Sequence, residues 1–110
     1  MFADVPAFAA LADDTRMRIV ETLAAGERSV GDLVDLFPIS QPAISRHLRL
    51  LRESGVVDVA ASGKQRIYRL NPTSLADVRG WAERVTRTWE ERFDALGDHL
   101  DRMKDEEQRH

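Results

Sequence analysis

Residues 40–55, SQPAISRHLRLLRESG, constrain the fold most, because they contain both a helix start and a helix stop. Ser40 is a favoured N-cap residue, and Pro42 is tolerated in a first turn, where its missing N–H costs little. Gly55 favours the left-handed backbone conformation that ends many helices. These signals predict a helix over residues 40–54.

The two faces of this helix differ in chemistry. Ile44, Leu48 and Leu51 recur at the spacing of a single core-facing stripe. The opposite face consists of small, polar and basic residues, namely Pro42, Ser45, Arg46 and Arg49. A basic helix face is by itself as consistent with simple solvation as with binding to an acidic partner. The sequence outside this helix distinguishes a solvated face from a face that binds an acidic partner.

The neighbouring segments predict a mainly α fold with one β-hairpin, arranged as a winged helix-turn-helix. Asp13 and Ser29 are favoured N-cap residues, and only Pro38 and Ile39 separate the preceding helix from the cap Ser40. The predicted elements are helices over 5–12, 13–26, 29–37 and 40–54, a hairpin wing over 56–70 and a long helix over 72–104.

The formal net charge of −3 hides a basic middle segment. Residues 40–70 carry six basic and two acidic side chains, net +4. Residues 1–39 have three basic against seven acidic groups, and residues 71–110 have seven against ten. Because charges are screened beyond about 8 Å at physiological salt, a ligand at the basic segment responds mainly to that segment. The predicted wing adds Lys64 and Arg66 to it, as candidates for contacts with a DNA backbone or minor groove.

Helix position and side-chain chemistry assign roles at a DNA major groove, which admits one α-helix with its amino-terminal residues at the base edges. Gln41 has the amide that pairs with adenine, and Arg46 has the planar fork that matches guanine. Ser45 and Arg49 are candidates for phosphate contacts, while Ser40 is mainly a cap. We therefore predict double-stranded DNA as a partner.

Two other residues of this helix have structural explanations of equal or greater weight. His47 lies on the flank of the apolar stripe, where a hydrogen-bonded histidine at the edge of the core is more common than a base contact. Arg52 has an acid to pair with at the helix end. Neither is assigned to the DNA site from the sequence.

The last predicted helix carries more apolar surface than one small domain can cover by itself. Beyond Leu75 and Val78, its stripe consists of Trp81, Val85, Trp89, Phe93, Leu96, Leu100 and Met103. Aromatic stripes at helical spacing more often pack in interfaces than hold ligands. We therefore expect this stripe to lie in a protein interface.

Other function classes are excluded by what the sequence lacks. Without cysteine there is no disulfide, thiolate nucleophile or cysteine metal site. The six glycines are scattered and no enzyme motif is present, so we expect neither an enzyme nor a cofactor. No apolar run is long enough to cross a bilayer, so we expect one cytoplasmic domain over residues 1–110.

The segment from Phe8 to Pro72 resembles the bacterial ArsR/SmtB family of winged-helix repressors. LADDTRMRIV, ISQPAISRHLRLLRESGVV and YRLNP fall in the order and spacing of that family. The resemblance implies a homodimer whose first and last helices form the interface, which adds Phe8 to the apolar stripe. It also implies binding to a palindromic operator, with repression until a signal arrives.

Many members of this family sense metals, with residues that are largely missing here. Their thiolate site is a Cys-Val-Cys type of motif on the third helix, where this sequence has SVGDLVDLF. Their other site, on the last helix, starts with Asp-x-His, but Gly97 stands two residues before His99. Asp98, His99 and Asp101 remain a weak candidate, and His110 is the other histidine on this helix or beyond it. We predict a metal-independent repressor of a cysteine-free subgroup.

Two alternatives stay open. One is a repressor that senses a small molecule, a protein or, weakly, a metal. A hydrophobic effector of this kind would bind between the last helices near Trp81, Trp89 and Phe93. The other is a winged-helix module that binds proteins. Such modules lack the basic face, so the net charge of +4 on residues 40–70 argues against it.

Overall fold

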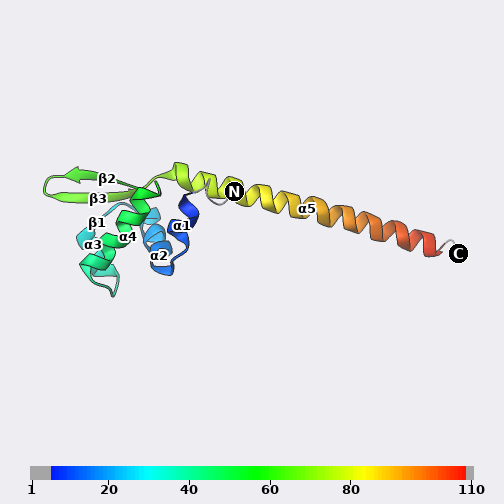
Figure 1. The fold of residues 1–110 in the computed structure, drawn as a ribbon, viewed down its shortest axis with the longest axis horizontal. Coiled ribbons are helices and arrows are strands. Elements are labelled where there is room, and N and C mark those ends of the chain that lie inside the picture. Colours follow the sequence, from blue (N-terminus) through cyan, green and yellow to red (C-terminus); the bar gives the residue numbers. More distant parts are fainter. Residues whose placement is uncertain (1–5, 109–110) are drawn as a thin grey trace. The chain divides into compact units, whose positions relative to one another are not determined.

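The computed structural model describes residues 6–108, and the chain consists of two compact units, residues 1–78 and 79–110. The helices are α1 (Ala7–Leu11), α2 (Asp14–Ala25), α3 (Val30–Leu36), α4 (Gln41–Glu53) and α5 (Pro72–Gln108), and the strands are β1 (Arg28–Ser29), β2 (Val57–Ser62) and β3 (Gln65–Leu70) (Figure 1). Helix α5 begins in the first unit and continues through the second. Within residues 6–108, no helix combines the length and the apolar character needed to span a membrane.

The first unit builds the predicted mainly α fold with a hairpin wing. Strands β2 and β3 pair antiparallel from Val57 opposite Leu70 to Ser62 opposite Gln65. Gly63 closes the turn between them with a positive φ of 61°. The expected hairpin is thus confirmed, with strands that begin and end within one or two residues of the predicted wing.

Strand β1 is an addition that the sequence did not predict. It contains only Arg28 and Ser29, which pair antiparallel with Tyr68 and Ile67 of β3, so that the sheet order is β1-β3-β2. Two residues are too short to show the alternation by which strands are recognised. Only the packing of β3 beside this segment makes it a strand.

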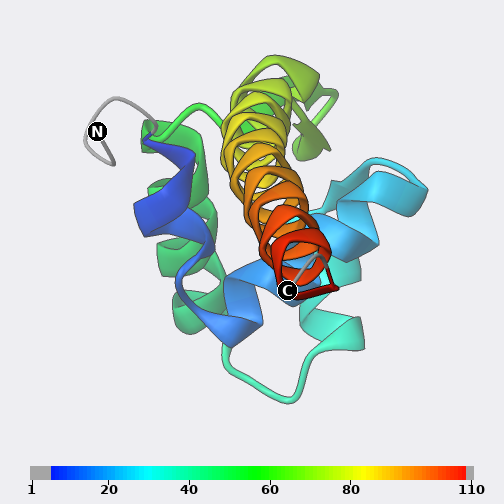
Figure 2. The same ribbon diagram turned by 90° about the vertical axis from the view of Figure 1, so that its right-hand side faces the viewer.

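The core of the first unit lies between helices α1 to α4 and the sheet. Helices α1, α2 and α4 contact one another, and Figures 1 and 2 show them side by side. The fully or nearly fully buried side chains are Ala7, Ala10, Ile19, Val20, Leu23, Leu33, Ile44, Leu48, Leu51, Val56, Val57 and Tyr68. Phe8 of α1 and Leu75 and Val78 of α5 are partly buried against this core.

The predicted starts of α2, α3 and α4 are confirmed by capping contacts. The side chain of Asp13 accepts a hydrogen bond from Arg16 N–H at the start of α2. Ser29 caps α3, and Gly55 follows α4 with a positive φ of 79°. Helix α5 starts at Pro72, as expected, but reaches Gln108 rather than residue 104.

The cap of α3 predicts a specific dependence of stability on pH. The N–H and the hydroxyl of Ser29 hold the pKa of Asp32 below its usual value, with a smaller contribution from the charge of Arg28. A carboxyl whose pKa is lower in the folded state stabilises the fold above its unfolded pKa, and this contribution is lost as the pH falls through the folded value.

We therefore expect Asp32→Asn, which keeps an acceptor oxygen, to lose less thermal stability than the unmodified chain between about pH 6 and about pH 3. Thermal unfolding monitored by circular dichroism measures this difference. Asp35→Asn on the same helix is the matched control, because the Asp35 carboxylate accepts no hydrogen bond within residues 6–108. Equal acid sensitivity of Asp32→Asn and the unmodified chain would contradict the expected role of this cap.

Candidate nucleic-acid interface

Helix α4 is held in the core by one face and presents the other to solvent. Ile44, Leu48 and Leu51 are almost completely buried, as their spacing predicted. The hydroxyl oxygen of Ser40 accepts a hydrogen bond from Ala43 N–H at 3.3 Å and so caps the helix. Burying one face therefore fixes which residues form the exposed face.

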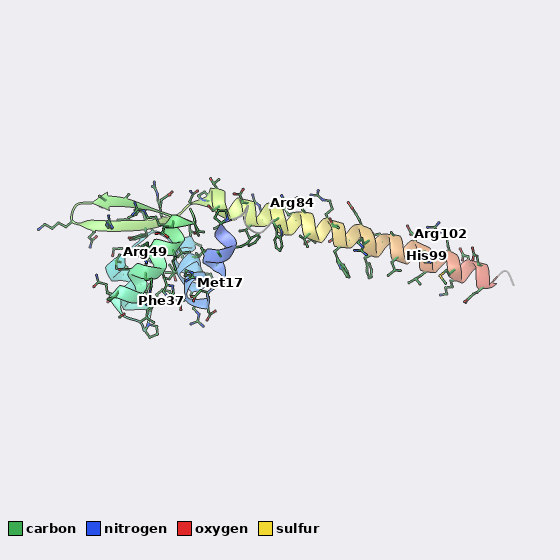
Figure 3. The ribbon with its side chains drawn as sticks, viewed as in Figure 1. Met17, Phe37, Arg49, Arg84, His99 and Arg102 are labelled. Atoms are coloured by element: carbon green, nitrogen blue, oxygen red, sulfur yellow. The ribbon has the colours of Figure 1, made fainter. Side chains whose placement is uncertain are left out.

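A hollow of about 870 Å³ lies on this exposed face, between α4 and the sheet. Gln41 is at the start of α4, Arg46 and Arg49 are one and two turns into it, and Arg66 comes from β3. The full lining is Val30, Gln41, Pro42, Ser45, Arg46, Arg49, Arg52, Arg66 and Tyr68. Arg49 is labelled in Figure 3.

Eight residues were predicted for a DNA site, and six of them line the hollow: Gln41, Pro42, Ser45, Arg46, Arg49 and Arg66. The other two, Ser40 and Lys64, are exposed but lie outside its lining. Ser40 is the helix cap, and Lys64 occupies the turn between β2 and β3.

Three further residues line the hollow without having been predicted for the site, namely Val30, Arg52 and Tyr68. Arg52 follows Arg49 by three residues and therefore lies on the same side of the helix. The acid near the helix end is Glu53. Its Oε1 atom lies 3.9 Å from Nε of Arg49, so it pairs with Arg49 and not with Arg52. Helical spacing therefore carried a signal for Arg52, whereas Val30 and Tyr68 approach the hollow only through tertiary packing.

The hollow is strongly cationic. Arg46, Arg49, Arg52 and Arg66 are all exposed, and within residues 6–108 the contact of Arg49 with Glu53 is the one ion pair among them. Both partners of this pair are about two-thirds exposed, and pairs of this kind contribute at most about 1 kcal/mol. A polyanion can therefore reach all four guanidinium groups at little cost.

The second unit carries the apolar stripe of α5. Its large apolar side chains are between 47% and 67% exposed, and they are Val85, Trp89, Phe93, Leu96, Leu100 and Met103. Trp81, at the start of this unit, is half-buried. A groove of about 340 Å³ runs along the same helix, lined by Trp81, Arg84, Val85, Thr88, Trp89 and Arg92.

The described part of α5 offers no donor set for a metal ion. His99 projects from the helix, as Figure 3 shows, and Asp98 and Asp101 are its acidic neighbours in the sequence. No three His, Asp or Glu side chains come together closely enough to bind one ion within residues 6–108. His110 lies outside the described residues.

The segment that contains α2, α3 and α4 also matches known proteins. The family model described as "Bacterial regulatory protein, arsR family" matches residues 13–59. The chain is 47% identical over 73 residues to the HTH-type transcriptional regulator Rv2034 of Mycobacterium tuberculosis, covering 66% of this chain and 68% of that protein. It is 38% identical over 74 residues to the transcriptional repressor SdpR of Bacillus subtilis, covering 67% and 82%. An ArsR-like transcriptional regulator from Rhodococcus sp. RHA1 superposes with a TM-score of 0.75 at 31% identity, covering 86% of this chain and 91% of that one.

The matched segment runs from the cap of α2 into β2 and so includes α4 and its basic face. The relatives are transcriptional regulators and repressors rather than enzymes. The family resemblance stated from the sequence is therefore confirmed. This chain belongs to the ArsR family of bacterial transcriptional regulators, which are DNA-binding proteins with a winged-helix fold.

Proposed function

We propose that this protein is a homodimeric, metal-independent repressor that binds an inverted-repeat operator. The observation that carries the proposal is the cationic hollow, in which four arginines surround the exposed face of a capped, amphipathic helix. A helix with this face outward matches the width of a DNA major groove, and the arginines match the charge of its walls.

The proposed contacts divide into reading and positioning. Gln41 and Arg46 read base edges near the amino-terminal end of α4, because an amide matches adenine and a guanidinium matches guanine. Ser40, Pro42, Ser45, Arg49 and the newly identified Arg52 lie along the flanking backbone, and Lys64 and Arg66 extend these phosphate contacts to the wing.

We propose that the two units act together as one domain that dimerises. The dimer interface consists of the stripe on α5 together with Phe8 of α1: Phe8, Trp81, Val85, Trp89, Phe93, Leu96 and Leu100. Six large apolar side chains of α5 are exposed in the single chain, from Val85 to Met103. This is unusual for a monomer, because exposed apolar patches of this kind generally mark interaction sites. In such a dimer the two α4 helices enter successive major grooves about 34 Å apart.

The donor atoms of the chain support metal independence. The sequence has no cysteine, and the described residues gather no group of three metal-binding side chains. Zinc sites in proteins require three or four such ligands around one point. Within one protomer, the Asp98, His99 and Asp101 stretch does not gather three such ligands around one point.

The test is fluorescence-anisotropy binding of the purified protein to its own upstream DNA and to scrambled DNA, at two salt concentrations, with and without a chelator. We expect tight, sequence-selective binding that weakens with salt and is unaffected by the chelator. Loss of selectivity on chelation would refute metal independence. Absence of DNA binding even at low salt would favour a protein-binding winged-helix module instead.

A wing variant checks the division between reading and positioning. We expect Lys64→Ala to weaken binding to operator and scrambled DNA by the same factor and to reduce the slope of log affinity against log salt by about one per protomer. Anisotropy titrations across a salt series measure both quantities. A selective loss of operator binding would show instead that Lys64 reads sequence.

A second candidate function is effector sensing at the groove of the second unit. Two tryptophans and Val85 provide an apolar floor in this groove, while Arg84 and Arg92 provide positive charge. Its volume lies near the lower end of the range for small-molecule sites. Quenching of tryptophan fluorescence by a candidate effector, together with release of operator DNA, would support this function.

A further inference from the structure

A polar cluster joins α4 to the start of α2, away from the cationic hollow. Nδ1 of His47 lies 3.4 Å from Nη1 of Arg16 and 4.0 Å from Oδ1 of Asp13. The His47 side chain is only 18% exposed. None of these three residues lines the hollow. His47 therefore contacts residues of the protein itself and lies outside the surface proposed to bind DNA.

Arg16 and Asp13 are themselves held in place by other contacts. Oδ1 of Asp13 accepts the backbone N–H of Arg16 at 3.1 Å, which caps α2. This hydrogen bond, together with the charge of Arg16, lowers the pKa of Asp13. The Arg16 side chain also donates from Nε to the carbonyl oxygen of Ala10 in α1. The cluster thus connects α1, α2 and α4 through a single arginine.

The apolar contacts of α4 fix its position against the core better than its rotation about its own axis. Ile44, Leu48 and Leu51 hold the helix against the core, but hydrophobic contact is non-directional. Hydrogen bonds, in contrast, weaken steeply with angle. With side chains, a helix has a radius of about 5–6 Å, so a rotation of 10° about its axis moves a side-chain tip by about 1 Å.

We propose that His47 is a positioning residue for operator recognition: its Nδ1 accepts a hydrogen bond from Nη1 of Arg16, and this contact fixes the rotation of α4 and thereby the direction of Arg46 and Gln41. The inference rests on the proposed DNA-binding function. Rotation of α4 affects paired hydrogen bonds to base edges more than contacts with phosphates, because the paired bonds demand a fixed geometry. His47 therefore affects selectivity more than general affinity for DNA.

The test replaces His47 by side chains that keep a polar atom near Nδ1, near Nε2 or at neither position. Asparagine places a polar atom near the position of Nδ1, glutamine places one near Nε2, and leucine fills similar space without a polar atom. We expect His47→Leu and His47→Gln to weaken operator binding about tenfold, a loss within the range for part of one paired base contact. We expect His47→Asn to bind within about threefold of the unmodified protein, a difference of less than about 0.7 kcal/mol. Binding to scrambled DNA and the melting temperature should change little in all three.

A second helix supplies an independent check. Arg16→Met removes the partner of His47 but keeps the backbone N–H that Asp13 accepts. We expect it to reproduce the loss seen in His47→Leu, and the double variant to lose no more than either single one, since both act through one contact. Arg18→Met is the matched control, because Arg18 is exposed on the same helix and pairs with Asp14.

The outcomes separate the two proposals. No selective binding by the unmodified protein would overturn the proposed function and this inference with it. Selective binding that survives His47→Leu would overturn this inference alone. Equal losses on operator and scrambled DNA, with no rescue by asparagine, would also overturn it, because they would indicate a phosphate contact or a folding defect.

Discussion

Replacing Arg46 by alanine is expected to weaken operator binding by about tenfold or more and to relax sequence preference at one base pair in each half-site. Arg46 is exposed, lies in the second turn of α4 and lines the hollow. A paired contact between guanidinium and guanine is worth about 1–3 kcal/mol of discrimination. A homodimer would lose this contact twice.

The measurement is anisotropy binding of Arg46→Ala to a set of operators in which each half-site position is varied in turn. The preference should flatten at one position and persist at the others. Arg18→Ala, an exposed arginine of α2 outside the hollow, is the matched control for the loss of a positive charge. An unchanged preference at every position would show that Arg46 contacts only phosphates.

Replacing Leu96 by aspartate is expected to have the largest effect, because it should convert the protein into a monomer. Leu96 is 53% exposed in the single chain and lies in the middle of the apolar stripe. A charge buried without a partner costs about 3–5 kcal/mol, so dimer affinity should fall by more than about 100-fold. A monomer occupies one half-site and should lose most of its operator affinity.

Sedimentation velocity at several concentrations measures the assembly, and anisotropy measures the DNA affinity. Arg87→Asp is the matched control, since it introduces the same side chain on the same helix. Residues nine positions apart lie on opposite faces of an α-helix, so Arg87 is remote from the stripe at Leu96. A Leu96→Asp variant that remains dimeric would show that the stripe is not the interface.

Much of the fold could be predicted from the sequence, because its signals are local. Asp13, Ser29 and Ser40 cap helices through contacts three residues away, and Gly55 ends α4 through its own backbone conformation. The buried stripe of α4 follows from helical periodicity alone. Strand β1 has no such local signal, because its two residues become a strand only by pairing with β3.

The candidate site was predicted in part for the same reason. Gln41, Arg46 and Arg49 belong to one helix face, so their spacing brings them together. The sequence allows two interpretations of Arg52, because spacing alone does not decide which arginine Glu53 approaches. The structure pairs Glu53 with Arg49. Tyr68 comes from a distant strand, and its place in the hollow depends on the register of β3.

The sequence by itself thus determined the helices and the hairpin, the helix caps, the basic face of α4 and the apolar stripe of α5, since each depends on residues a few positions apart. Only the tertiary structure decided which side chains from different elements meet. It joined Arg66 of β3 to the arginines of α4, and it set His47 against the cap of α2. The physical reason is that contacts between remote segments depend on how helices and strands pack, and this packing is a property of the whole core rather than of any one stretch.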